Sequence, residues 1–310
     1  MNRSHESRAG STDNDQSATG RRGFLRGAAT VGTTLVGFGA ATGTAAAGGS
    51  DGDYEAPHDY PLISTRDHYA INWYGDPYLT DGHTATDYDT VGDWDKYDDA
   101  TEICVFVHGW NADDGNDDDI DSAYTCELAL DQNGYDAFNV GFSWDSDKGG
   151  GIDQGWYEAK EIARNNGPKL ANWITDTDRP VRLIGHSLGA RVVGSALETL
   201  NEWGRHDAVR SATLLGGAID DEDVELDDEY GTDIRDVAGQ FDNYYKTDDD
   251  VLAWAYSLGE FNSAVGRYGI QDEADAPANY EDHDVTDVVP DHGSYYEPGD
   301  GCIPQVVSEF

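Results

Sequence analysis

Residues 181–200 read VRLIGHSLGARVVGSALETL, and this stretch decides the fold. The mostly apolar run Val181 to Ile184 leads into Gly185-His186-Ser187-Leu188-Gly189, and the helix-like stretch Ala190 to Leu200 follows directly. Short apolar runs of this kind are typical of buried strands in parallel sheets, where both faces are covered. The stretch therefore predicts a buried strand, a tight turn centred on a serine, and a helix.

Ser187 lies at the centre of this predicted turn. Gly-x-Ser-x-Gly between a strand and a helix is the pattern of a nucleophile elbow, which exposes a serine hydroxyl above the end of a sheet. Gly185 and Gly189 let the backbone approach closely there. The alternative is an ordinary turn that happens to hold a serine, since the chain contains 37 glycines. The strand before the turn and the helix after it favour Ser187 as a nucleophile.

Strands and helices alternate along the rest of the chain. This alternation predicts an α/β fold with a doubly wound, mostly parallel sheet flanked by helices, whose reactive groups collect at the carboxyl ends of the strands. A hairpin from Tyr60 to Trp73 is expected to supply the first strands. The predicted strands are Ile103–Val107, Phe138–Trp144, Val181–Ile184, Ala212–Leu215 and Phe241–Tyr245, and the predicted helices are Ser122–Asn133, Gln154–Thr175, Ala190–Trp203 and Val251–Ala264.

A serine nucleophile needs a base to remove its proton and a carboxylate to orient that base. His292, in Asp-His-Gly-Ser-Tyr-Tyr near the end of the chain, is the best-placed base. His283 is the rival, but the carboxylates that flank it favour a solvated surface histidine. The acid is expected after the strand Phe241–Tyr245, where Asp248, Asp249 and Asp250 are candidates, and Asp248 and Asp250 could instead cap the next helix.

A tetrahedral intermediate also needs backbone N–H groups that bind its oxyanion. Leu188 offers one of them, directly after the serine. The second is expected from Trp110 in His108-Gly109-Trp110, which follows the strand Ile103–Val107. The aromatic residues Trp110, Trp144, Tyr295 and Tyr296 either line an acyl pocket or belong to the core.

From about Thr101 to Tyr296 the chain resembles an α/β-hydrolase of the esterase and lipase type. The resemblance rests on the elbow, the His-Gly turn, an Asp after a strand and a late His, in that order. It implies Ser187, Asp249 and His292 as catalytic residues, a structural role for His108, and acyl transfer to water without a metal or an organic cofactor. The alternatives are an inactive binding or surface-associated module with this fold, or another acyl-transfer enzyme such as a thioesterase, peptidase or acyltransferase.

The formal net charge is −43, with 62 acidic and 19 basic residues. This excess of negative charge argues against binding to nucleic acid or to an anionic membrane surface, so a small-molecule ester is the expected partner. The composition resembles secreted proteins of halophilic archaea. Asp113–Asp121 and Asp220–Asp233 are expected to be surface loops. The run Asp113–Asp117 does not have the ligand spacing of an EF-hand, and the sequence contains no His-Glu-x-x-His.

The N-terminus carries Arg21-Arg22-Gly23-Phe24-Leu25-Arg26 and then an uncharged stretch rich in Gly, Ala and Thr. This resembles a twin-arginine export signal and predicts a secreted protein, or one held at the outer face of the membrane by an uncleaved signal. The expected organisation is a signal at 1–47, a flexible leader at 48–56 and one hydrolase domain at 57–310. Of three cysteines, Cys104 is expected to be a buried thiol, and Cys126 and Cys302 either pair or stay free.

The acidic composition predicts a dependence on salt. Lowering salt from molar to ~0.1 M lengthens the Debye length from ~3 Å to ~10 Å, so repulsion among the carboxylates is no longer screened. We expect the protein to unfold or lose activity, which circular dichroism and intrinsic fluorescence across a salt series would detect. Stability that does not change over this range would contradict a halophilic protein.

Overall fold

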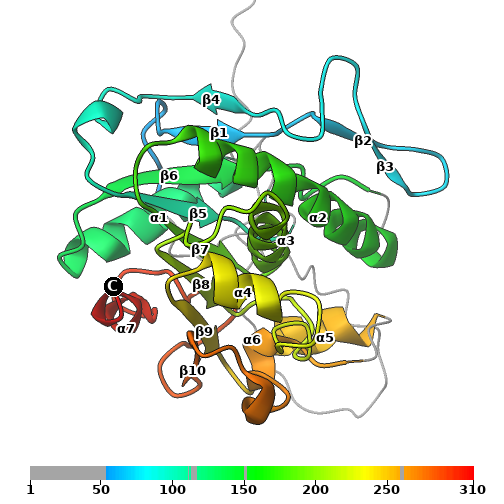
Figure 1. Ribbon diagram of the computed structural model, residues 1–310, viewed down its shortest axis with the longest axis vertical. Helices are drawn as coiled ribbons and strands as arrows, with labels where there is room; N and C mark the ends of the chain where they lie inside the picture. Colours follow the sequence, from blue (N-terminus) through cyan, green and yellow to red (C-terminus); the bar gives the residue numbers. More distant parts are fainter. Residues whose placement is uncertain (1–53, 111, 113–116, 150–151, 259–261) are drawn as a thin grey trace, which may run out of the picture. The chain divides into compact units, whose positions relative to one another are not determined.

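The computed structural model describes residues 54–110, 112, 117–149, 152–258 and 262–310. An eight-stranded sheet organises these residues in the strand order β10-β9-β8-β7-β5-β6-β1-β4 (Figure 1). All neighbouring strands in it are parallel except β1 and β4, which are antiparallel. The strands are β1 Leu62–Ser64, β4 Asp89–Val91, β5 Ile103–Val107, β6 Phe138–Ser143, β7 Val181–His186, β8 Ser211–Leu215, β9 Phe241–Tyr245 and β10 Tyr280–Asp284.

Helices cover both faces of this sheet, which confirms the predicted doubly wound α/β fold. One core cluster joins the sheet to α2 Ile152–Asp176, α3 Gly189–Glu202, α4 Gly231–Val237, α5 Asp250–Ser257 and α6 Val265–Tyr268. The other cluster lies under α1 Asp118–Gln132 and α7 Ile303–Ser308. Figure 1 shows these two helices together, away from α2 and α3. Two short 3₁₀ segments, η1 Tyr97–Asp99 and η3 Glu273–Asp275, complete the helical elements of the described residues.

The central strands are buried on both faces, which explains their continuous apolar sequences. Every residue of β5 and of β7 is buried. From β5 the chain moves to β6 on one side and then to β7 on the other, so the strand order reverses between β5 and β7. In open α/β sheets the crevice outside the carboxyl ends of the strands at such a reversal is where ligands bind. Ser187 follows β7 at this point.

The predicted hairpin from Tyr60 to Trp73 is wrong. β1 joins the main sheet between β6 and β4, whereas β2 Tyr69–Ile71 pairs with β3 Pro77–Leu79 in a separate two-stranded sheet. A buried carboxylate explains the change of direction after β1. The backbone N–H groups of Asp67 and Tyr69 donate to the two oxygens of Asp145 at 3.0 and 3.1 Å, which draws the chain away from β1.

Two further differences concern the C-terminal third. The predicted helix Val251–Ala264 ends at Ser257, and α6 is a separate turn of helix. The strand β10 was not predicted, because its sequence YEDHD contains no apolar run. It pairs only with β9, at the edge of the sheet, where polar side chains are tolerated.

The acidic stretch Asp113–Asp121 is not simply a surface loop. Residues 113–116 lie outside the described residues, while the remainder enters α1. Asp119 is buried, accepts a hydrogen bond from Ser143 Oγ, and pairs with Arg66 Nη2 at 3.2 Å. This carboxylate therefore ties α1 to β6, because a buried charge requires partners.

The second acidic stretch, Asp220–Asp233, is likewise partly internal. It includes the start of α4, and Asp221, Asp223 and Asp233 are buried. Burial, with Glu229 adding repulsion, raises the pKa of Asp223 to about 7. The expectation of a solvated loop is wrong for these three side chains.

The three cysteines are free and buried, and they share the cluster under α1 and α7. Cys104 is the buried thiol that its place in an apolar strand predicted, and Cys126 and Cys302 do not form a disulfide. The predicted signal at 1–47 and most of the predicted leader at 48–56 lie outside the described residues.

Candidate active site

Ser187 occupies a strained turn between β7 and α3. Its φ of 51° is in the left-handed region, which costs a residue with a side chain roughly 1–2 kcal/mol. Hydrogen bonds hold the turn: Ser187 N donates to Leu215 O of β8 at 3.0 Å, and Ala218 N donates to Ser187 O at 2.9 Å. A non-glycine residue kept at positive φ by its neighbours is the backbone feature expected of a nucleophile elbow.

The two flanking glycines allow close backbone contacts. A Cβ at Gly189 would lie 2.3 Å from the carbonyl oxygen of Val107, and one at Gly185 would lie 3.2 Å from the backbone nitrogen of Ala190. The 2.3 Å distance at Gly189 leaves no room for the Cβ of any other residue. The start of α3 can therefore lie directly against the end of β5.

The His108-Gly109-Trp110 loop contacts the elbow. A Cβ at Gly109 would lie 2.9 Å from Ser187 Cβ, so glycine lets this loop approach the serine. His108 is buried and braces the loop: Nε2 accepts from Trp144 N at 3.1 Å, and the His108 carbonyl accepts from Trp144 Nε1 at 3.0 Å. Burial lowers the pKa of His108 to about 4, consistent with a neutral ring in a structural role.

Asp249 and His292 lie together although 43 residues separate them. His292 Nδ1 donates to Asp249 Oδ2 at 2.7 Å, and both side chains are at least 97% buried. Asp249 Oδ1 also accepts from Leu252 N at 2.9 Å at the start of α5. Burial alone would raise the pKa of Asp249, but the hydrogen bonds and charge of His292 together with the Leu252 N–H lower it, so the carboxylate is favoured.

His186 links the His292 loop to the elbow. Its Nε2–H donates to the carbonyl oxygen of His292 at 2.8 Å, and the two rings lie 5.0 Å apart. Burial lowers the pKa of His186 to about 3, so the ring stays neutral and keeps this donor. His186 lies within the Gly-x-Ser-x-Gly motif, but this role cannot be predicted from the motif because the partner, His292, is 106 residues away.

The rival candidates are placed elsewhere. Asp248 is exposed and pairs with Lys246 Nζ, and the helix cap expected of Asp248 or Asp250 is made by Asp249 itself. His283 is not a freely solvated histidine: on β10 its Nε2 bonds Asp242 Oδ1 at 2.9 Å, and this bond raises the pKa of His283. Together with exposed Glu281, these two side chains form a compact set of ligand-type groups away from Ser187.

The four candidate pocket aromatics belong to the core. Trp144, Tyr295 and Tyr296 are at most 2% exposed and Trp110 is 8% exposed. Trp110 stacks on Trp254 of α5 with ring centroids 6.0 Å apart. Trp110 is the most exposed of the four side chains.

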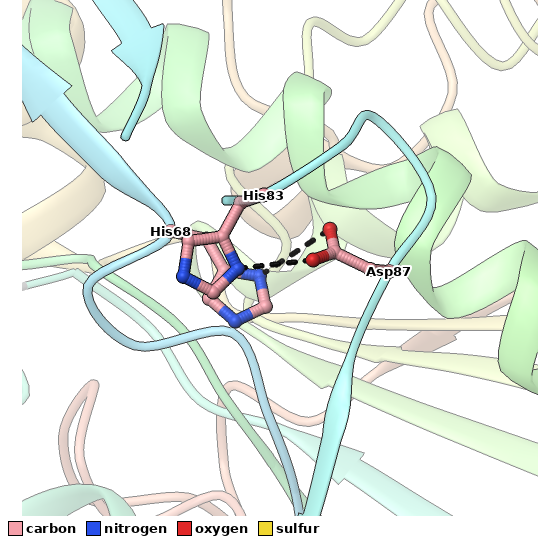
Figure 2. Close-up of side chains that lie close together, drawn as sticks. All are labelled: His68, His83 and Asp87. Carbon is pink, nitrogen blue, oxygen red and sulfur yellow. Dashed lines mark hydrogen bonds and ion pairs between the residues drawn. The ribbon is translucent and has the colours of Figure 1, made fainter. Parts of the chain in front are cut away.

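A second set of ligand-type side chains is formed by His68, His83 and Asp87 (Figure 2). The two imidazoles stack with centroids 3.7 Å apart, and His83 Nδ1 lies 2.9 Å from Asp87 Oδ2. The buried ammonium of Lys169 lies among them: it donates to Asp87 Oδ1 at 2.7 Å and to His68 Nδ1 at 3.1 Å. Because the Lys169 ammonium already donates to Asp87 and His68, the cluster is best explained as a structural anchor.

Residues 147–306, more than half of the chain, match the family described as protein of unknown function (DUF726). The transmembrane and coiled-coil domain-containing protein STS1 of Oryza sativa subsp. japonica is 34% identical over 148 residues, covering 46% of this chain and 21% of that protein. An uncharacterized membrane protein of Schizosaccharomyces pombe is 28% identical over 149 residues, covering 47% and 18%. The matches thus span about a fifth of the length of these relatives.

Among solved structures, an α/β serine hydrolase without a lid from Xanthomonas campestris is 13% identical, with a TM-score of 0.37, covering 68% of this chain and 82% of that one. A pyrethroid hydrolase from Sphingobium faniae is 12% identical, with a TM-score of 0.36, covering 68% and 96%. A lipase-esterase related protein from Clostridium acetobutylicum is 12% identical, with a TM-score of 0.33, covering 68% and 93%. These likenesses concern the fold alone.

The predicted localisation is corrected by these comparisons. Both curated relatives are named as membrane proteins, which contradicts the expectation of a protein secreted, or held outside the membrane, through twin-arginine export. Within the part of the chain that the structure describes, no helix combines the length and apolar character needed to cross a membrane.

The Lys169 anchor makes a stability prediction. Lys169→Met should lower the free energy of unfolding by about 1–3 kcal/mol, because Thr84 O, His68 Nδ1 and Asp87 lose their donor. Urea denaturation measures this change. Lys160→Met on the same helix is the matched control and should cost less than about 1 kcal/mol. An unchanged midpoint for Lys169→Met would contradict the structural anchor.

Proposed function

The chain belongs to the DUF726 family of proteins of unknown function, and from its site we propose that it is a serine hydrolase that cleaves carboxylic esters through an acyl-serine intermediate. The observation that carries the proposal is the buried 2.7 Å hydrogen bond between Asp249 and His292, whose loop His186 ties to the turn that holds Ser187 at positive φ. This arrangement has the nucleophile, base and orienting carboxylate that acyl transfer requires.

In the proposed reaction, Asp249 orients the imidazole of His292. Because Nδ1 donates to the carboxylate, Nε2 is the nitrogen that accepts the proton of Ser187 Oγ. His292 Nε2 is buried and has no hydrogen-bond partner among the described residues. Contacts between nucleophile and base are often long in unliganded enzymes and shorten when substrate binds.

Ser187 Oγ then attacks the ester carbonyl, and negative charge develops on the carbonyl oxygen. Leu188 is the N-cap residue of α3, and backbone N–H groups at the start of a helix have no intrahelical acceptor. We assign the oxyanion to the N–H of Leu188 and to the N–H of Trp110, because the loop holding Trp110 lies against Ser187. His292 returns the proton to the leaving alkoxide, and water activated by the same base releases the acid.

The group that leaves the acyl carbon is proposed to be an alkoxide, as in an ester. The main alternative is a thiolate, as in a thioester. The presence of Ser187 in a strained turn and of a hydrogen-bonded Asp249–His292 pair argues against an inactive binding module. A substrate panel of p-nitrophenyl esters and acyl thioesters of matched chain length distinguishes the two bond types.

Ser187→Ala should abolish labelling by a fluorophosphonate probe and reduce ester turnover by at least ~10³-fold, because the nucleophile is removed. Mass spectrometry of the labelled wild-type peptide identifies the reactive serine. Ser257→Ala, at an exposed serine on α5, is the control and should label normally. Labelling that persists in folded Ser187→Ala would refute the assignment, and no labelling of folded wild-type protein would favour the inactive module.

Asp249→Asn should lower kcat by roughly 10³–10⁴-fold, because an amide facing Nδ1 favours the wrong tautomer of His292. Asparagine keeps an oxygen that accepts from Leu252 N, so the cap of α5 is preserved. Asp248→Asn, one residue away and exposed, should leave kcat within about threefold. Equal losses in the two variants, measured with the best ester of the panel, would rule out Asp249 as the triad acid.

A further inference from the structure

A second cleft lies at the other end of the sheet from Ser187. Helix α2 ends at Asp176 and β7 begins at Val181, so the end of α2 lies near the amino ends of the parallel strands, whereas Ser187 follows a carboxyl end. The cleft has a volume of about 370 Å³, enough for a small organic molecule. It is lined by Tyr88, Thr90, Trp94, Asp95, Tyr97, Asp98, Trp173, Asp176 and Thr177.

Aromatic rings form its walls. The ring of Trp94 lies 5.9 Å from that of Tyr97 and 6.5 Å from that of Trp173, each pair tilted by 56°. Rings tilted in this way form a corner instead of a flat stack. Trp94 and Tyr97 also pack on Phe138, which supports them from the core side.

The polar ends of these rings already have partners. Tyr88 Oη donates to Asp176 Oδ2 at 2.8 Å, Trp94 Nε1 donates to Val91 O at 2.8 Å, and Tyr97 Oη bonds Thr177 Oγ1 at 2.7 Å. A ligand would therefore meet mainly the π surfaces of the rings. Such surfaces are electron-rich and bind cations, with Trp the best of the three aromatic types.

Charge at the cleft has one sign. Asp95, Asp98 and Asp176 line it, and the described lining residues include no Lys or Arg. One of these rings already contacts a cation from outside the lining: the guanidinium of Arg179 lies 5.6 Å from the centroid of Tyr97. The cleft thus combines a carboxylate rim with aromatic walls whose polar ends are already hydrogen-bonded.

We propose that this cleft binds a small soluble organic cation with a methylated ammonium group. A quaternary ammonium has no N–H to satisfy, so aromatic walls can take its methyl groups while the aspartates balance its charge. A primary ammonium would instead need several acceptors held at hydrogen-bond distance. The proposal does not depend on the hydrolase activity.

Choline chloride and 3,3-dimethyl-1-butanol test the proposal, because they have nearly the same shape and differ in charge. Isothermal titration of the whole protein with choline chloride, replacing equal NaCl to keep ionic strength constant, should give a millimolar Kd. The neutral alcohol should bind at least tenfold more weakly. Equal binding of both compounds, or no binding of choline to folded protein, would overturn the proposal.

Variants locate the binding. Thr90→Arg places a cation in the cleft from an exposed position and should weaken choline binding at least tenfold, whereas Thr90→Gln, similar in length but neutral, should change it less than threefold. Trp94→Leu should also lose binding, with Trp203→Leu, an exposed tryptophan on the segment after α3, as its control. Choline binding that is unchanged in folded Thr90→Arg and Trp94→Leu would place the cation elsewhere and refute this site.

Discussion

The close approach of three backbone segments at Ser187 is the constraint on which the candidate site depends. Gly189 lies against the Val107 carbonyl, Gly109 lies against Ser187, and Leu215 accepts from the serine N–H. A side chain at either glycine would separate the elbow from β5 or from the following loop. The strain of positive φ at Ser187 is sustained because the hydrogen bonds of the neighbouring strands hold the turn.

The parallel sheet brings the other groups to this turn. Asp249 follows β9, two strands from β7, and its carboxylate serves both α5 and His292. His186 donates to the His292 carbonyl, so the strand that carries the serine also holds the loop that carries the histidine. Because the side chains of Asp249, His186 and His292 are buried, their hydrogen bonds lie in surroundings of low dielectric constant that screen charge weakly.

The distribution of acidic residues matters as much as their number. Asp119, Asp145 and Asp249 are buried, and each holds backbone or side-chain donors that join separate elements. The exposed carboxylates around the aromatic cleft, by contrast, leave their charge available to a ligand. The same residue type therefore organises the interior at one place and supplies surface potential at another.

The succession of central strands and helices along the chain could be predicted from the sequence, because β5 to β8 are buried throughout and mostly apolar, and β9 carries aromatic residues at both ends. It also singled out Ser187, Asp249 and His292 as candidates, since each follows a strand or lies in a characteristic turn. Four features appear only in the tertiary structure: the path of the chain after β1, the polar edge strand β10, the burial of Asp119 and the contact of His186 with His292. These features depend on hydrogen bonds between residues distant in the chain, which local periodicity does not encode.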